Sequence, residues 1–217
     1  MKHSFPTLYL FNNVFFPHTV IPLTVSDGVS KAVLLECFEQ DQHLAFYHPS
    51  LRAKKIGTVG KILFLEHNAD QSMSVLVQGI LRVQLVTQEQ HIPYPVFQVD
   101  DYFDNSDNVI IMENSLERLH DVLSGWLQRH ISSNKERERF MKEMNTPLRL
   151  INNLCMLVIK DVELKEIFLD SISLPDRIRM MDALLRGETP EGEDMGMSEA
   201  IKSFERLDPQ IDIKNAV

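Results

Sequence analysis

The spacing of apolar residues changes once along this chain, and that change limits the classes of fold open to it. Through residues 81–86 apolar and polar side chains alternate, a period of two that predicts a half-buried strand. Over residues 116–126 apolar side chains recur every three or four positions, which is the period of an amphipathic helix. The polar run 104–108 separates the two patterns. The sequence therefore predicts an α+β protein in which strands come first and helices follow.

Three regions follow from this pattern. We expect a strand-rich domain over residues 1–105 and a small α-helical bundle over residues 109–187. Residues 188–217 are rich in Gly, Pro and Glu at their start, so we expect an acidic linker and tail with one short helix over 198–207. The apolar content of 44% is enough for the first two regions to bury a core.

The first region contains signals for six or seven short strands and a single helix. Asp27 is placed as the N-cap of that helix, which runs to about Glu39. Many strands with one helix suggest a small β-barrel-like domain rather than a parallel α/β sheet. The expected strands cover residues 8–11, 20–25, 44–47, 60–66, 72–77, 81–86 and 96–99.

The second region carries several helix-start signals. Ser133 and Glu136 fit a capping box, Thr146 and Pro147 fit an N-cap followed by the first helical residue, and Ser173 fits the N-cap of a last helix. Gly187 fits the residue that stops this last helix. Apolar stripes on these helices predict that they pack as a bundle.

Charge and cysteine usage argue against some functions. The formal net charge of −9 disfavours nucleic acid as a partner, because phosphates require a basic surface. The cysteines, Cys37 and Cys155, lie far apart in apolar helical contexts and are expected to be buried thiols in a reducing compartment. No leader peptide and no run of about 20 apolar residues is evident, so we expect a soluble cytoplasmic protein.

Three segments of the first region resemble a known family. They are residues 14–23, with the phrase Val14-Phe15-Phe16-Pro17 before Ile21-Pro22-Leu23, residues 57–62 and residues 79–83. In this order they are similar to the N-terminal substrate-binding domain of Lon-type ATP-dependent proteases, and the resemblance spans roughly residues 7–186. His18 stands where the family commonly has Gly after its Phe-Pro.

The resemblance implies both a fold and a function. The fold is a PUA-like β pseudo-barrel followed by a helical bundle. The function is non-catalytic binding of unfolded or hydrophobic polypeptide segments, with a protease or chaperone as a further partner. The alternative is an RNA-binding PUA-like module, which predicts a clustered basic face.

Motifs for catalysis, nucleotides and metals are missing from the sequence. Gly57 and Gly60 are too close for a phosphate loop, and Ile62 follows Lys61 where a hydroxyl residue is required. No Gly-x-Ser-x-Gly elbow is present. Glu117 and His120 have di-iron spacing without a second copy, which favours an ordinary helix face. We therefore predict no enzyme activity, catalytic residue, metal or cofactor, and rank an enzyme with a deep polar pocket last.

The candidate peptide-binding residues come from the aromatic and proline-rich segment near the start. On a regular strand two adjacent phenylalanines cannot both face one core, so we expect one of them to be exposed. Exposed apolar surface often marks a binding site. The predicted residues are Phe15, Phe16, Pro17, Ile21 and Pro22.

Overall fold

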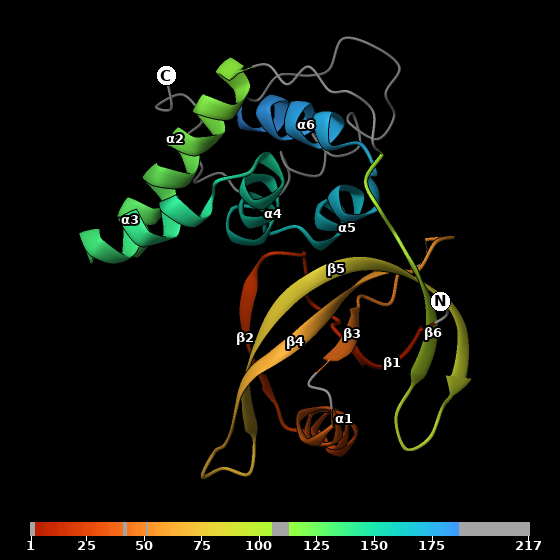
Figure 1. Cartoon of the computed structure of the whole chain (residues 1–217). Helices are drawn as coiled ribbons and strands as arrows, with labels where there is room; N and C mark the ends of the chain where they lie inside the picture. The colour runs from red at the N-terminus through yellow and green to blue at the C-terminus, as the bar shows by residue number, and fades with distance from the viewer. Residues whose placement is uncertain (1–2, 41–42, 51, 106–112, 187–217) are drawn as a thin grey trace. The chain divides into compact units, whose positions relative to one another are not determined.

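A computed structural model describes residues 3–40, 43–50, 52–105 and 113–186 of the chain. The chain divides into two compact units, of which the first ends at Phe103 and the second begins at Asp104 (Figure 1). The predicted boundary lies at residue 105. Gly187 and residues 198–207, for which a helix stop and a short helix are predicted, lie outside the described residues.

The first unit is a six-stranded mixed sheet with one helix. The order is β2-β5-β4-β3-β1-β6, and β6 also pairs with β5. Strands β1, β3, β4, β5 and β6 therefore close into a ring, and β2 extends the sheet outside it along β5. The strands are β1 His3–Tyr9, β2 Val20–Val25, β3 His43–Tyr47, β4 Ile56–His67, β5 Met73–Gln90 and β6 Val96–Asp101, and the helix is α1 Gly28–Glu39.

The longest strand, β5, corrects one expectation. Residues 72–77 and 81–86 were predicted as two strands, but residues 73–86 all lie within one strand of 18 residues, Met73–Gln90. Gly79 between them is not a turn. It lies where the backbone of another segment comes very close, and a Cβ built on it would lie 2.2 Å from the carbonyl oxygen of Phe16. The N-terminal half of β5 pairs with β2, and the C-terminal half pairs with β6.

The first strand also differs from its prediction. It spans residues 3–9 rather than 8–11, and Phe11 lies in the turn that follows, 68% exposed. Alternation alone missed this strand because Pro6 falls within it. The helix prediction is confirmed: the Asp27 carboxylate accepts a hydrogen bond from the Ser30 N–H at 2.8 Å, and α1 packs against β1, β3 and β4.

The ring has an apolar interior. At one end a cluster of buried side chains comes from four strands, with Phe5, Tyr9 and Leu81 packed around it. Alternate residues of each strand point inward, as the period of two predicts. The buried members are Tyr47, Val59, Val83, Leu85, Phe97 and Val99.

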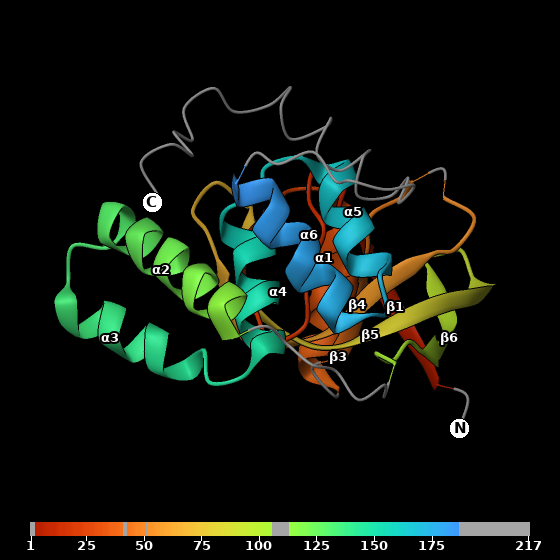
Figure 2. The same cartoon turned by 90° about the horizontal axis from the view of Figure 1, so that it is seen from above.

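The second unit is a bundle of helices. Helix α4 packs against α2, α5 and α6, and its Leu150, Ile151, Leu154 and Cys155 are buried. Figure 2 shows α2 and α3 side by side. Within the described residues no helix is long and apolar enough to cross a membrane. The helices are α2 Glu113–His130, α3 Asn134–Glu143, α4 Pro147–Leu157, α5 Val162–Asp170 and α6 Leu174–Arg186.

The predicted caps of this bundle are confirmed. The hydroxyls of Ser133, Thr146 and Ser173 each accept a hydrogen bond from the N–H three residues later, at 3.3 Å. A capping side chain satisfies one of the backbone donors that a helix leaves open at its start, which contributes about 1 kcal/mol to helix stability. The starts of α3, α4 and α6 are therefore set by local sequence.

Gly125 offers a simple test of packing in α2. It lies inside the helix, and a Cβ built on it would meet nothing within 4 Å. Glycine in a helix interior costs about 0.5–1 kcal/mol relative to alanine, because its backbone loses more freedom on folding. We expect Gly125→Ala to raise the free energy of unfolding by that amount in urea denaturation. An unchanged or lower value would contradict the open space around this position.

Candidate functional site

The segment predicted to bind peptide is largely buried. Phe15 is 2% exposed and Phe16 is 0% exposed, and Pro17 is also buried. The expectation that one of the two phenylalanines faces solvent is therefore wrong. It assumed a regular strand, whereas no strand covers residues 10–19, so the two-residue alternation does not apply and both rings turn inward.

Specific contacts hold this segment against the sheet. The Phe15 ring meets the Phe46 ring edge-on, with centroids 5.1 Å apart. The Phe15 carbonyl accepts a hydrogen bond from the Thr58 hydroxyl, and the Phe16 carbonyl accepts one from the Thr19 hydroxyl at 2.7 Å. The segment therefore belongs to the interior of the first unit.

The two remaining predicted residues lie on opposite faces of β2. Ile21 is 6% exposed, and it pairs with Val77 of β5, which in turn pairs with Ile62 of β4. This row is buried. Pro22 is exposed. It is therefore the one predicted residue with solvent-accessible surface, and its role in binding stays a prediction.

Pro22 belongs to an apolar row on the outer face of the sheet. It pairs with Leu76 of β5, and Leu76 pairs with Phe64 of β4. Phe64 is 53% exposed, and Leu76 is half-buried. Val20, two residues before Pro22 on the same face of β2, is 49% exposed. Side chains paired across neighbouring strands lie close enough to touch, so these residues form one continuous surface.

A bulge adds a further apolar side chain to this surface. Ile62 pairs with Val77 and Phe64 pairs with Leu76, so Leu63 is an extra residue in β4. Leu63 is 46% exposed. An extra residue breaks the alternation of faces, which allows two adjacent apolar residues to be exposed together. We call Val20, Pro22, Leu63, Phe64 and Leu76 the outer-sheet patch.

Polar side chains border the outer-sheet patch along the strands. On one side the row is Thr24, Ser74 and Glu66, and on the other side Gln78 pairs with Lys61. An apolar centre with a polar rim is the usual composition of a surface that binds another polypeptide.

The sequence did contain a signal for this surface. Residues 62–65 read Ile-Leu-Phe-Leu, four consecutive apolar residues in a strand. On a strand with one buried face, at least two of them must point outward. The sequence alone does not align this run with Pro22, because the pairing through β5 joins segments that lie about 40 residues apart.

A second surface of the first unit combines cations with aromatic rings. Arg82 and the Lys54 ammonium lie over the Tyr102 ring, at 5.3 Å and 5.6 Å from its centroid, and Lys55 lies 5.6 Å from the centroid of Phe97. The adjacent Asp100 and Asp101 are exposed and reduce the positive charge. The cations are already engaged with the protein's own rings.

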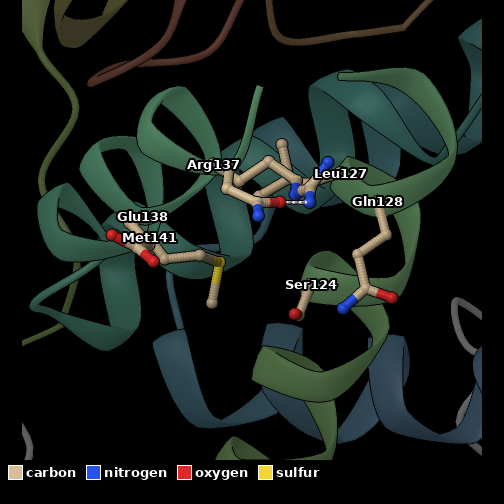
Figure 3. Close-up of a pocket in the computed structure, with 7 residues that line it drawn as sticks. Ser124, Leu127, Gln128, Arg137, Glu138 and Met141 are labelled. Atoms are coloured by element: carbon tan, nitrogen blue, oxygen red, sulfur yellow. Dashed lines mark hydrogen bonds between the residues drawn. The ribbon is translucent and has the colours of Figure 1, made fainter. Parts of the chain in front are cut away.

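A pocket of about 360 Å³ lies between α2 and α3 of the second unit (Figure 3). Arg137 is held there by the Asn134 side chain and by the carbonyl oxygens of Ile131 and Ser132. The lining has one carboxylate and neither histidine nor cysteine, so it holds no nucleophile with an adjacent base. The lining residues are Ser124, Leu127, Gln128, Asn134, Arg137, Glu138 and Met141.

The buried titratable groups offer no reactive pair within the described part of the chain. Cys37 and Cys155 are buried thiols that form no disulfide, as predicted, and burial raises the pKa of the Cys155 thiol, which keeps it protonated and unreactive. Burial lowers the pKa of Lys165. Burial and a hydrogen bond with Glu36 raise the pKa of Tyr94 to about 12. Among the described residues no three His, Cys, Asp or Glu side chains gather where they could hold a metal.

Comparison with known proteins agrees with the fold. The solved N-terminal domain of Mycobacterium avium complex Lon protease superposes with a TM-score of 0.66 at 18% identity, covering 82% of this chain and 96% of that one. The Lon N-terminal domain protein from Xanthomonas campestris gives a TM-score of 0.61 at 15% identity, covering 83% and 98%. The fold is therefore the α+β fold of Lon N-terminal domains.

Sequence relatives lead to the same family. Lon protease of Nitrosococcus oceani is 30% identical over 129 residues, which are 55% of this chain and 16% of that protein. Lon protease 2 of Myxococcus xanthus is 26% identical over 194 residues, 83% of this chain and 23% of that protein. The chain thus spans less than a quarter of the length of these relatives. The model of the ATP-dependent protease La (LON) substrate-binding domain matches residues 4–186, and the chain belongs to this family.

Proposed function

We propose that this protein binds unfolded polypeptide, and that the outer-sheet patch is the surface that contacts it. The observation that supports this most is the exposed row formed by Pro22, Leu76 and Phe64, extended by Val20 and by the bulged Leu63. Unfolded chains expose apolar side chains that folded proteins bury, so a surface of this kind distinguishes the two states. The family description of a substrate-binding domain is consistent with this role.

The size of the patch suits weak, reversible binding. Covering a large apolar side chain completely contributes about 1.5–3 kcal/mol, and the patch residues are already partly covered. Association costs several kcal/mol in lost freedom of motion, so the net affinity falls near the micromolar range. Affinity in this range allows a bound segment to be released again.

A double substitution tests the patch. Leu63→Ser with Phe64→Ser removes its two largest exposed side chains and keeps the strand extended. We expect the dissociation constant for unfolded polypeptide to rise about tenfold, because roughly 1.4 kcal/mol of apolar contact is lost. The probe is a fluorescently labelled small protein kept unfolded by reduction and carboxymethylation of its cysteines, and binding is measured by fluorescence anisotropy.

Two controls make the experiment specific. Ile92→Ser removes an apolar side chain that is 85% exposed. Ile92 lies in the loop after the C-terminal end of β5, whereas Leu76 lies near the N-terminal end of that strand. It should leave the affinity unchanged. The folded form of the same probe protein should bind at least tenfold more weakly. Equal affinity for the folded and unfolded probe, or equal losses in the Leu63/Phe64 and Ile92 variants, would contradict the proposal.

RNA binding is the second candidate, and one observation favours it. Lys54, Lys55 and Arg82 gather around Tyr102 and Phe97. Phe97 and Arg82 are buried, but Lys54 and Lys55 are exposed, and the neighbouring Phe103 is 71% exposed. An exposed aromatic ring beside cations, such as Phe103, can stack on single-stranded bases. The net charge of −9 opposes it. Binding of a labelled single-stranded RNA that weakens steeply with salt, and with Lys54→Ala, would favour this candidate over the first.

A further inference from the structure

Strand β2 is an edge strand of the sheet. Each strand of the ring of β1, β3, β4, β5 and β6 pairs with two other strands of the ring, whereas β2 lies outside the ring. Within the described part of the chain β2 pairs with β5 alone. Helix α1 makes its main contacts with β1, β3 and β4. No other described strand pairs with the side of β2 that faces away from β5, so this side can receive another backbone.

The register shows which backbone groups of β2 point toward that open side. The Gly79 N–H donates to the Thr19 carbonyl at 2.9 Å, immediately before the pair formed by Val20 and Gln78. In an antiparallel ladder this bond places Val20 in a non-hydrogen-bonded pair, with its own N–H and C=O directed away from β5. The pattern repeats every second residue, so Pro22 and Thr24 are oriented in the same way.

The open edge thus presents two donors and three acceptors. The donors are the N–H groups of Val20 and Thr24, and the acceptors are the carbonyls of Val20, Pro22 and Thr24. Pro22 has no N–H, and this position is one at which a sheet tolerates proline, since β5 requires no hydrogen bond from it. All three residues are exposed. Successive groups on the edge lie about 7 Å apart, the repeat of an extended strand.

We propose that β2 receives an extended segment of foreign polypeptide as an added strand. This inference rests on the proposed function and specifies how the bound polypeptide is held. Backbone hydrogen bonds to the edge are independent of side chains, so they suit clients of many sequences. The side chains of the added strand that point to the outer face would continue the apolar row from Phe64 through Leu76 to Pro22.

A second copy of this chain is a poorer occupant of the same edge. In a symmetric pairing of two β2 strands, each partner brings its own Pro22 near the centre of a six-residue strand. The pair would lack a donor on both sides. Proline on an edge strand is a known safeguard against such self-pairing. A client segment without proline keeps all of its own N–H groups. Its pairing with β2 lacks only the hydrogen bond for which Pro22 has no N–H.

Restoring the missing donor tests the proposal directly. The probe is a synthetic ten-residue peptide of alternating valine and threonine with a lysine at each end, and its dissociation constant is measured by calorimetry. Pro22→Val keeps an apolar side chain and adds an N–H at the open edge, so it should tighten binding roughly two- to tenfold. Thr24→Pro removes a donor and should weaken binding by a similar factor, whereas Thr24→Val keeps the N–H and should not weaken it.

The peptide provides a matched control. The same peptide with N-methyl groups on its four central residues keeps its side chains but cannot donate from the centre. We expect it to bind at least tenfold more weakly to the unmodified protein, because it cannot donate to the carbonyls of Val20, Pro22 and Thr24. If Thr24→Pro lowers the melting temperature, the Pro22→Val gain and the N-methyl loss still decide the question.

The possible outcomes separate the two proposals. If Pro22→Val and N-methylation each change the affinity by less than twofold while Leu63→Ser with Phe64→Ser weakens it, strand addition is wrong and the patch stands. If Pro22→Val tightens binding while the patch variant changes nothing, strand addition stands and the patch is wrong. If the unmodified protein dimerises in sedimentation equilibrium and Thr24→Pro abolishes the dimer, the edge belongs to a second copy and the proposal fails.

Discussion

Gly79→Ala is expected to destabilise the first unit by about 3 kcal/mol or more, the upper end of the cost of overpacking a core. A Cβ at this position would lie 2.2 Å from the Phe16 carbonyl oxygen, a distance that real atoms do not reach. The obstacle is backbone rather than a flexible side chain. The same residue also donates its N–H to the Thr19 carbonyl and accepts a hydrogen bond from the His18 N–H, both at 2.9 Å. The segment cannot move away without losing these bonds.

The measurement is the free energy of unfolding from urea denaturation of the whole chain. Gly28→Ala is the matched control in the same unit, because a Cβ there would meet nothing within 4 Å. It should change stability by less than about 0.5 kcal/mol, as most surface substitutions do. If Gly79→Ala and Gly28→Ala had equal effects, the close approach of residues 16–17 to β5 would be wrong.

Arg177→Met is expected to cost the second unit about 3 kcal/mol. The Arg177 side chain is 1% exposed, forms an ion pair with Asp104 and donates to the Asn152 side-chain oxygen. Removing one member of a buried ion pair leaves the other charge without compensation, which costs about 3–5 kcal/mol. The lower end applies because the Asp104 side chain retains 25% exposure and can be solvated in part.

Asp104→Asn provides the other half of a double-mutant cycle. Combining it with Arg177→Met removes both charges of the pair, so the double variant should recover part of the stability that Arg177→Met alone loses. The Nε of Arg177 has no hydrogen-bond partner within the described residues, so the unmodified site is itself incompletely satisfied. Strictly additive losses in urea denaturation would show that the two side chains do not interact.

Much of the fold could be predicted from local sequence. Asp27, Ser133, Thr146 and Ser173 cap helices as their side chains indicate, because a cap depends on residues only three positions apart. The change of period near residue 105 separated strands from helices for a similar reason. Errors occurred where distant segments meet. Gly79 fell between two predicted strands, and the close approach of the Phe16 carbonyl explains a glycine within one continuous strand.

The candidate site could be predicted less well. Phe15 and Phe16 attract attention as adjacent aromatic residues, but their burial depends on a segment whose path local rules do not describe. Pro22 was identified, yet its neighbours Leu76 and Phe64 were not, because strand pairing is set by the whole sheet. The bulge at Leu63 is equally invisible to alternation. The family resemblance in the sequence suggested a polypeptide-binding protein. The register of β2, β5 and β4 was needed to identify a candidate surface for that binding.

The position of β2 outside the ring has a consequence for how this protein can diversify. The barrel closes through β1, β3, β4, β5 and β6, so its integrity does not require the outward residues of β2. Val20, Pro22 and Thr24 can therefore change during evolution with little penalty to folding, and under the proposed function such changes would alter the set of chains that the protein binds. The part of the proposed binding surface that lies on β2 can thus vary without disturbing the closed ring, whereas Leu63, Phe64 and Leu76 belong to strands of the ring itself.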